Sequence, residues 1–370
     1  MAEREPKEIY FKKNGLFAHT SHVKNEDAFI TVEIAVVNES KEDQPVWIDI
    51  HMHQLIDTGK LQIAEEPGIK AKGMTKLFLP KGAQKTARTQ LCVENAVMWD
   101  IETPILYVVE AVLYKPVQEG EALPNPKLVA GLAMQKPHSM KMLDFEETRF
   151  GIREIAMDAK NGFCINGKSM KLIGGKLLSS TENEKTDTKE EAFELEYEKV
   201  KAYKESGCNA VWVESEKMSD DFFDACNRLG VLVLDEVCKK ERICHERSFP
   251  SVAAWMMGKH LLAESENKES DSLEFSELVR ALDSTRCVGG VCDDSFGESA
   301  DGSFDHKIWN DVTEAVCAPW DFVGYPKENH WFDEAGVLFP NRMIILEGSR
   351  RSECKEYLTR YGNIIGIFEN

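Results

Sequence analysis

The chain has 370 residues, enough for two hydrophobic cores, because single domains usually contain roughly 100–200 residues. Its 64 acidic and 45 basic residues give a formal net charge of −19, which repels nucleic-acid phosphates and anionic lipid surfaces. The N-terminus lacks the apolar core of a secretion signal, and no apolar run is long enough to span a membrane. We therefore expect a cytoplasmic protein without nucleic-acid or membrane partners.

Alternating apolar and polar residues fill the first part of the chain, from Leu16 to about Met142. This period of two is typical of strands with one buried face. The clearest runs are residues 29–38, 46–53, 86–93 and 106–114. Turn residues such as Asn38-Glu-Ser and Pro80-Lys-Gly separate the runs. The pattern predicts an immunoglobulin-like β-sandwich domain over residues 1–147.

Eight short apolar runs characterise the second part of the chain. They are residues 165–173, 209–213, 230–234, 252–257, 287–292, 322–325, 343–346 and 364–368. Eight such runs alternating with helix-like stretches predict a (β/α)8 TIM barrel over residues 148–370, and the sequence stops on the eighth strand, before a last helix. Chemistry in such barrels takes place at the C-terminal ends of the strands, so the residues just after each run are the candidate site.

Helix signals lie between these runs. Residues 188–191 read Thr-Lys-Glu-Glu, a capping box, and Ser219 and Gly230 bracket a second helix. Two further helices are predicted from apolar stripes that we expect to pack against the barrel. These stripes are Leu273, Phe275, Leu278, Val279 and Leu282, and then Ile308, Val312 and Val316.

Neither the histidines nor the cysteines form a convincing metal site. His51 and His53 share one strand face, but a solvent-facing strand surface explains them at least as well. Cys244 and His245, with Cys238 upstream, lack a second pair at ligand spacing. The ten cysteines lie mostly inside apolar runs, which suits buried, reduced thiols in a reducing compartment.

Several ordered motifs also connect the two parts of the chain. They are residues 150–153 (Phe-Gly-Ile-Arg), 161–168 (Asn-Gly-Phe-Cys-Ile-Asn-Gly-Lys), 172–175, 207–210, 223–236, 250–258, 279–286 and 319–325, with residues 99–107 near the end of the sandwich. Together they resemble glycoside hydrolase family 2, the β-galactosidase and β-glucuronidase group, over about residues 10–370. The resemblance implies the sandwich and barrel described above. It also implies that a sugar-binding jelly-roll domain before the chain and a closing helix after it are missing.

The family uses two carboxyl groups, which retaining glycosidases hold about 5–5.5 Å apart. The resemblance places the acid/base after strand four, in an Asn-Glu pair, where this chain has Lys259 and His260. His260 thus stands at the acid/base position, and Lys259 replaces an amide that holds a sugar hydroxyl. A histidine can donate a proton, but its reach and charge differ from those of glutamic acid.

The nucleophile is expected at the end of strand seven. A gapless match puts Gly348 on the family's glutamate, whereas Glu347 takes that place only if the register slips by one residue. Such a slip points a side chain to the other side of a strand. Glu347 is therefore a candidate nucleophile, with a structural or surface carboxylate as the alternative.

Other pocket positions of the family are also substituted. Relatives carry histidines after strand one where this chain reads Leu177-Leu-Ser-Ser, an arginine-histidine pattern where it has Trp212, and Asn-Tyr where it has Pro326-Lys. Asp235 and Glu236 after strand three remain. We take Glu236, Asp235, Trp212 and Lys259 as the candidate substrate-binding residues.

We expect no metal and no cofactor. Metal-using relatives imply magnesium near Glu236, but Cys238 and His260 stand where its other ligands should be. A softer metal such as zinc on Glu236, Cys238 and His260 is the weaker alternative, since nothing establishes the required geometry.

Two functions follow from the resemblance. The first is a β-galactosidase-type O-glycosyl hydrolase of carbohydrate metabolism, with weak or lost activity and a carbohydrate or glycoside as its partner. The second is a pseudoenzyme: a non-catalytic carbohydrate-binding or scaffold relative, favoured by simultaneous substitution at several strand ends. The sugar, the linkage and the oligomeric state stay open.

Overall fold

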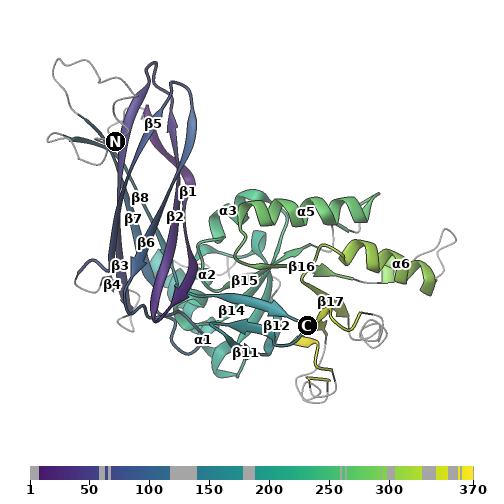
Figure 1. The fold of residues 1–370 in the computed structure, drawn as a ribbon. Helices are drawn as coiled ribbons and strands as arrows, with labels where there is room; N and C mark the ends of the chain where they lie inside the picture. Colours follow the sequence, from purple (N-terminus) through teal and green to yellow (C-terminus); the bar gives the residue numbers. More distant parts are fainter. Residues whose placement is uncertain are drawn as a thin grey trace. The chain divides into compact units, whose positions relative to one another are not determined.

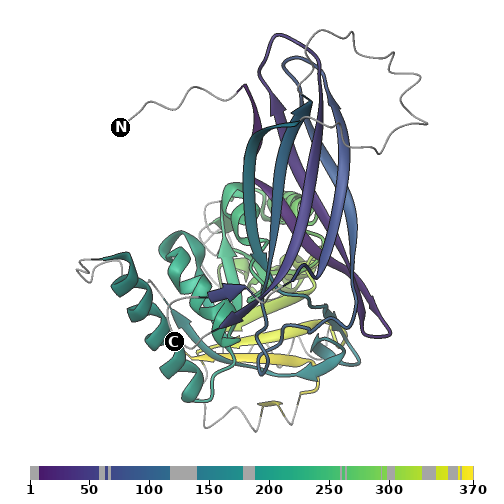
Figure 2. The same cartoon turned by 90° about the vertical axis from the view of Figure 1, so that its left-hand side faces the viewer.

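The structure is a computed structural model that describes residues 8–57, 63–65, 68–116, 140–177, 188–258, 261–262, 265–292, 294–297, 305–326, 339–348, 357–358 and 361–369. The chain divides into two compact units (Figures 1 and 2). The first lies within Met1–Thr58, Gln62–Val97 and Ile105–Ile152, and the second within Gly59–Leu61, Met98–Pro104 and Arg153–Asn370. Within the described ranges, no helix combines the length and the apolar composition needed to cross a bilayer.

The first unit is built from two antiparallel sheets. One sheet has the order β1-β2-β6, and the other the order β4-β3-β7-β8 with β5 also paired to β3. The bounds are β1 Ile9–Lys24, β2 Asp27–Asn38, β3 Gln44–Asp57, β4 Ile63–Glu65, β5 Ala71–Leu79, β6 Gln84–Val93, β7 Tyr107–Pro116 and β8 Met140–Phe150. The alternating pattern is borne out, since Ile30, Val32 and Ile34 on β2 are completely buried. This is the sandwich that the sequence predicts.

A small hairpin sheet opens the second unit and corrects one predicted strand. Residues 165–173 are not one strand: β10 (Gly162–Ile165) pairs with β9 (Ile155–Asp158) and β11 (Lys168–Met170), and the first barrel strand begins only at Leu172. The break comes from Asn166 and Gly167, whose φ angles are 51° and 74°. Two successive positive φ values make the tight turn that reverses a hairpin.

Eight parallel strands form a closed barrel in the second unit, as predicted. The strands are β12 Leu172–Leu177, β13 Ala210–Glu214, β14 Leu232–Val237, β15 Val252–Met257, β16 Cys287–Val291, β17 Phe322–Pro326, β18 Met343–Glu347 and β19 Ile364–Glu369. Closure is direct, because Leu172 of β12 pairs with Gly366 of β19. The eight strands therefore complete the ring that the eight apolar runs imply.

Helices cover the outside of the barrel (Figure 1). The described helices are α1 Lys189–Glu205, α2 Asp220–Leu229, α3 Lys240–Glu246, α5 Lys268–Leu282 and α6 His306–Cys317, with short 3-10 turns η1 Ser215–Lys217 and η2 Asp294–Gly297. The predicted caps are confirmed: the Thr188 side chain accepts from Glu191 N, and Ser219 accepts from Phe222 N. Gly230 ends α2 with φ 69°, the left-handed conformation that favours glycine.

The predicted apolar stripe on α5 is wrong in part. Leu273 and Leu278 are 48% and 41% exposed, while Ser272 and Ser276 are buried. The hydroxyl of Ser272 donates to Val316 O at 2.5 Å, and that of Ser276 donates to Pro319 O at 3.0 Å. Because these hydrogen bonds satisfy both hydroxyls, small polar side chains can face the protein where leucines were expected. Ile308 on α6 is likewise 36% exposed.

Candidate functional site

Four side chains meet inside the barrel at the C-terminal ends of its strands, and we call them the mouth cluster. They are Lys176 on β12, Trp212 on β13, Glu236 on β14 and Glu347 on β18. The Lys176 Nζ lies 3.3 Å from Glu236 Oε2 and 3.7 Å from Glu347 Oε1. Trp212 Nε1 donates to the same Glu236 Oε2 at 3.1 Å, and Lys176 Nζ lies 4.7 Å from the centre of the Trp212 ring. One ammonium group therefore bridges carboxylates from two different strands.

Strand alternation explains why these side chains point inward. Val211 and Val213 belong to the core between strands and helices, so Trp212 between them faces the barrel interior. Ile344 and Leu346 lie in the same outer core, which turns Glu347 inward by the same rule. On β14, Val237 lies in the outer core, which leaves the neighbouring Glu236 on the inner face.

The mouth cluster is nearly closed to solvent. The side chains of Lys176, Glu236 and Glu347 are 11%, 3% and 9% exposed. Carboxylates withdrawn from water need a compensating charge and hydrogen-bond donors. Lys176 supplies the positive charge to both carboxylates, and Trp212 donates a hydrogen bond to Glu236. These contacts compensate the burial of the two carboxylates.

The structure places Glu347 inside the barrel. It is the last residue of β18, and Gly348 follows with φ 82° and donates its N–H to Phe368 O at 2.8 Å. The carboxylate is thus presented at the strand end where barrel chemistry takes place. Its role as a nucleophile stays a hypothesis. His260 and Lys259, the other residues taken from strand-end motifs, lie outside the described residues.

Trp212 is the aromatic member of the mouth cluster. Its side chain is completely buried, and Phe368 packs edge-on against it with ring centroids 6.0 Å apart and an interplanar angle of 85°. The packing against Phe368 and the hydrogen bond to Glu236 hold the indole in place. The role of Trp212 in binding a substrate stays a prediction.

Asp235 lies on the opposite face of β14 from Glu236. It is fully buried close to the carboxyl group of Glu246 on α3, which also pairs with Arg242. Burial, followed by the charge and hydrogen bond of Asp235, raises the pKa of Glu246 well above its usual value. Burial beside a second carboxyl therefore favours the protonated form of Glu246. Asp235 faces this group behind the barrel wall, and its role in binding a substrate stays a prediction.

Metal-ligand geometry is not found among the residues that the structure describes, where no three His, Cys, Asp or Glu side chains are grouped to hold an ion. Burial, then the charge of Glu216, raises the pKa of Cys238 to about 12. Its thiol is therefore protonated at neutral pH when no metal ion is bound. In the sandwich, His53 Nε2 lies 3.7 Å from Glu110 Oε2.

Lys176 is the site residue that sequence reasoning missed. It follows Gly174 and Gly175, and a Cβ at Gly174 would lie 1.7 Å from Ala210 O, so only glycine fits there. Strand alternation in β12 could have identified Lys176. Because Leu177 faces outward, the preceding residue on the strand has to face the barrel interior. Its partners stand 60 and 171 positions farther along the chain.

Comparisons with known proteins agree with the fold. No family model matches the chain. The β-galactosidase BoGH2A of Bacteroides ovatus is 24% identical over 90% of this chain and 40% of its own length. A solved glycosyl hydrolase family 2 member from Bacteroides cellulosilyticus superposes with a TM-score of 0.73 and 25% identity, covering 98% of this chain and 46% of its own.

A more distant structure shares the same architecture. The β-glucuronidase of Bacteroides uniformis has a TM-score of 0.66 and 17% identity, covering 98% of this chain and 46% of its own. At that identity the likeness concerns the fold alone. These neighbours point to glycoside hydrolase family 2, as the sequence motifs did, and the chain spans less than half the length of each of them.

Proposed function

We propose that the barrel mouth is a carbohydrate-binding site of the glycoside hydrolase type in which hydrolysis is weak or absent. The fold and its relatives support a glycoside hydrolase framework. The single observation that carries the loss of hydrolysis is the position of Lys176, whose ammonium lies between Glu236 and Glu347.

A retaining hydrolase needs a carboxylate free to attack the anomeric carbon. Glu347 is not free in this sense, because the Lys176 ammonium is 3.7 Å from its Oε1 in a nearly closed site. An ion pair stabilises the carboxylate before reaction, and breaking it adds to the barrier.

The transition state provides the stronger argument. It resembles an oxocarbenium ion and is positively charged. The Lys176 ammonium beside Glu347 would oppose the development of that positive charge. Hydroxyl groups of a neutral sugar carry no such penalty, so binding survives where hydrolysis does not.

A second candidate function is a slow retaining hydrolase that uses Glu347 as nucleophile. The observation that favours it is the inward position of Glu347 at the end of β18, where a barrel enzyme presents reactive groups. In this case Lys176 would have to move away from Glu347 when a substrate binds.

Calorimetric titration with methyl β-galactoside and methyl β-glucuronide tests the binding proposal. We expect millimolar binding of at least one glycoside to the parent protein, and at least fivefold weaker binding to Glu236→Gln. Glu277→Gln, an exposed change on α5, serves as the matched control and should bind as the parent does. Absence of binding by both glycosides, or equal binding by the parent and Glu236→Gln, would contradict the proposal. Turnover of p-nitrophenyl glycosides that Glu347→Gln abolishes would support the second function instead.

A further inference from the structure

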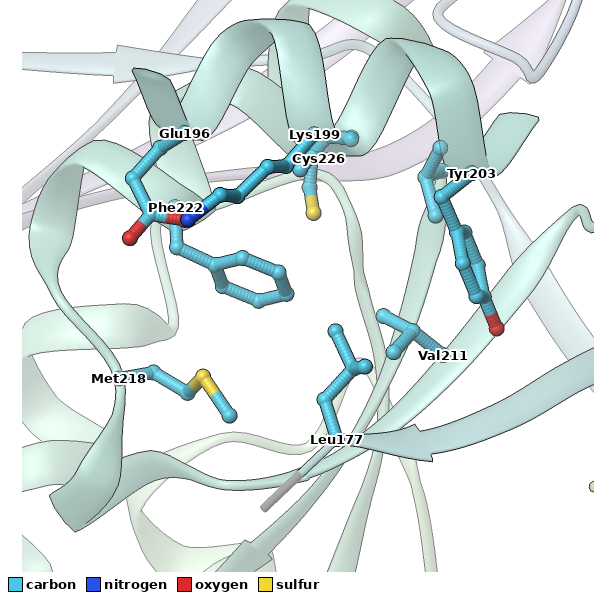
Figure 3. A pocket seen from close by; sticks show the side chains of 10 residues that line it. Leu177, Glu196, Lys199, Tyr203, Val211, Met218, Phe222 and Cys226 are labelled. Atoms are coloured by element: carbon cyan, nitrogen blue, oxygen red, sulfur yellow. The ribbon is translucent and has the colours of Figure 1, made fainter. Parts of the chain in front are cut away.

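A cavity of about 270 Å³ lies between the barrel wall and helices α1 and α2 (Figure 3). Most of its lining is apolar: Leu177, Val200, Val211, Met218, Phe222 and Val231. An apolar pocket of this size has room for a small guest molecule.

Water is a poor occupant for the middle of this cavity. A buried water needs two to four polar partners. The Tyr203 hydroxyl on one side already accepts from Gly175 N at 2.5 Å and donates to Ala210 O at 2.8 Å. Burial, then the charge of Glu196, raises the pKa of Cys226, so its thiol stays neutral and is only a weak donor. The chemistry of the walls favours an apolar guest.

One side of the cavity is polar. Figure 3 shows the carboxylate of Glu196 and the amine of Lys199 together there, away from the Tyr203 hydroxyl. Glu196 is only 5% exposed, although it is a charged residue. Because Glu196 and Lys199 carry opposite charges, a neutral group that both donates and accepts a hydrogen bond matches them better than an ion does.

We propose that this cavity binds a small neutral aromatic alcohol, with its ring among the apolar side chains and its hydroxyl toward Glu196 and Lys199. The size is adequate, since a dry apolar cavity of about 150 Å³ is enough to bind benzene. A space of about 270 Å³ has room for a ring with a short substituent. The site lies outside the barrel and does not depend on the function proposed for the mouth cluster.

The cavity is separated from the mouth cluster by a single layer of strands. Leu177 lines the cavity, while its neighbour Lys176 points into the barrel toward Glu236. On the next strand, Val211 lines the cavity while Trp212 faces inward. A guest would therefore touch the outer side of the two strands that carry Lys176 and Trp212, and the indole N–H resonance of Trp212 should shift when the guest binds.

Saturation-transfer NMR with 4-ethylphenol and the full chain tests the proposal, with ethylbenzene as the probe that lacks a hydroxyl. We expect 4-ethylphenol to bind at least threefold more tightly than ethylbenzene. Val200→Phe fills the cavity from α1 and should weaken binding of 4-ethylphenol at least tenfold. Ala202→Phe places the same ring on the exposed side of α1 and should leave binding unchanged.

Cys226→Leu fills the same space from α2 and keeps the test valid if Val200→Phe does not fold. Filling a real void should maintain or raise the melting temperature, whereas overpacking a closed core should lower it. No binding of either probe to the parent, with a lower melting temperature in both filled variants, would overturn the proposal. Equal binding of the two probes would overturn the assignment of the polar side, as would binding of 4-ethylphenol that neither filled variant weakens.

Discussion

Lys176 Nζ lies 3.7 Å from Glu347 Oε1 inside the barrel, and the same nitrogen is 3.3 Å from Glu236 Oε2. The two carboxylates stand on strands β14 and β18, which are not neighbours in the barrel. Lys176 is therefore a cross-link between separate parts of the wall, and it compensates the buried charges of both carboxylates.

Replacing Lys176 by methionine should destabilise the fold. Methionine keeps most of the side-chain volume but leaves two buried carboxylates without their cation, and breaking a buried pair typically costs about 3–5 kcal/mol. Urea unfolding measures this loss. Lys217→Met is the control, since Lys217 Nζ pairs with Glu214 at 2.6 Å but is half exposed, and it should cost less than about 1 kcal/mol. An equal effect at both positions would contradict a special role for Lys176.

Glu246→Gln should flatten the dependence of stability on pH. Burial and Asp235 raise the pKa of Glu246 in the folded state. A carboxyl with a raised pKa holds its proton more tightly when folded, so its contribution is complete below the ordinary glutamate pKa, near 4.3, and is lost as pH rises through the folded pKa. We expect the parent to lose stability relative to the variant as the pH rises above the ordinary glutamate pKa. Glu241→Gln, exposed on the same helix, should behave as the parent. Parallel profiles for the parent and Glu246→Gln would contradict a raised pKa for Glu246.

Asp283→Asn should be among the most destabilising single changes in the barrel. Asp283 Oδ2 accepts from Trp255 Nε1 at 2.8 Å and from Arg286 Nη1 at 2.6 Å, and both members of the ion pair are buried. Burial alone would raise the pKa of Asp283, but the Arg286 charge and the hydrogen bonds outweigh it and lower the pKa. The contribution is therefore present above the ordinary aspartate pKa, near 3.9, and is lost as pH falls through the folded pKa.

The cost of Asp283→Asn should be about 3–5 kcal/mol at pH 7, because Arg286 is left buried without its counter-ion. Chemical denaturation measures it. Glu198→Gln removes one partner of an exposed pair with Lys201 and should cost less than about 1 kcal/mol. A loss at Asp283 as small as that at Glu198 would mean that the ion pair adds nothing to stability.

Restoring the family's acid/base motif should not restore hydrolysis. Lys259→Asn with His260→Glu supplies a carboxylic acid, and general acid catalysis contributes roughly 10²–10⁴-fold. Lys176 would still hold Glu347 and oppose the positive transition state, so we expect no p-nitrophenyl β-galactoside turnover above buffer. Measurable turnover in the double variant, absent from the parent, would show that Lys176 does not block the chemistry.

The barrel could be predicted from the sequence because each strand is a continuous apolar run, and because cap signals such as Gly230 mark helix ends locally. The first strand was misplaced because the Asn166-Gly167 turn interrupts an apolar run that looks continuous. The serines of α5 were missed because their hydrogen bonds go to carbonyls of Val316 and Pro319, more than 40 residues away.

The site was harder to predict because its interactions are not local. Asp235 and Glu236 are adjacent and chemically alike, and only the strand's orientation shows that they face opposite sides. The sequence alone does not identify Lys176 as a site residue. Its role depends on contacts with Glu236 and Glu347, which form only when the barrel closes. Glu347 was identified as a candidate, but its inward direction needed the pairing of β18 with its neighbours.

Hydrolysis of 2,4-dinitrophenyl β-galactoside tests most directly whether Lys176 prevents Glu347 from acting as a nucleophile. This leaving group departs without general acid help, so the rate reports on the nucleophile alone and is independent of His260. We predict that the parent and Glu347→Gln hydrolyse it at the same rate as buffer. Burst release of dinitrophenol by the parent that Glu347→Gln abolishes would show that Glu347 is a working nucleophile beside Lys176, and would contradict the proposed loss of hydrolysis.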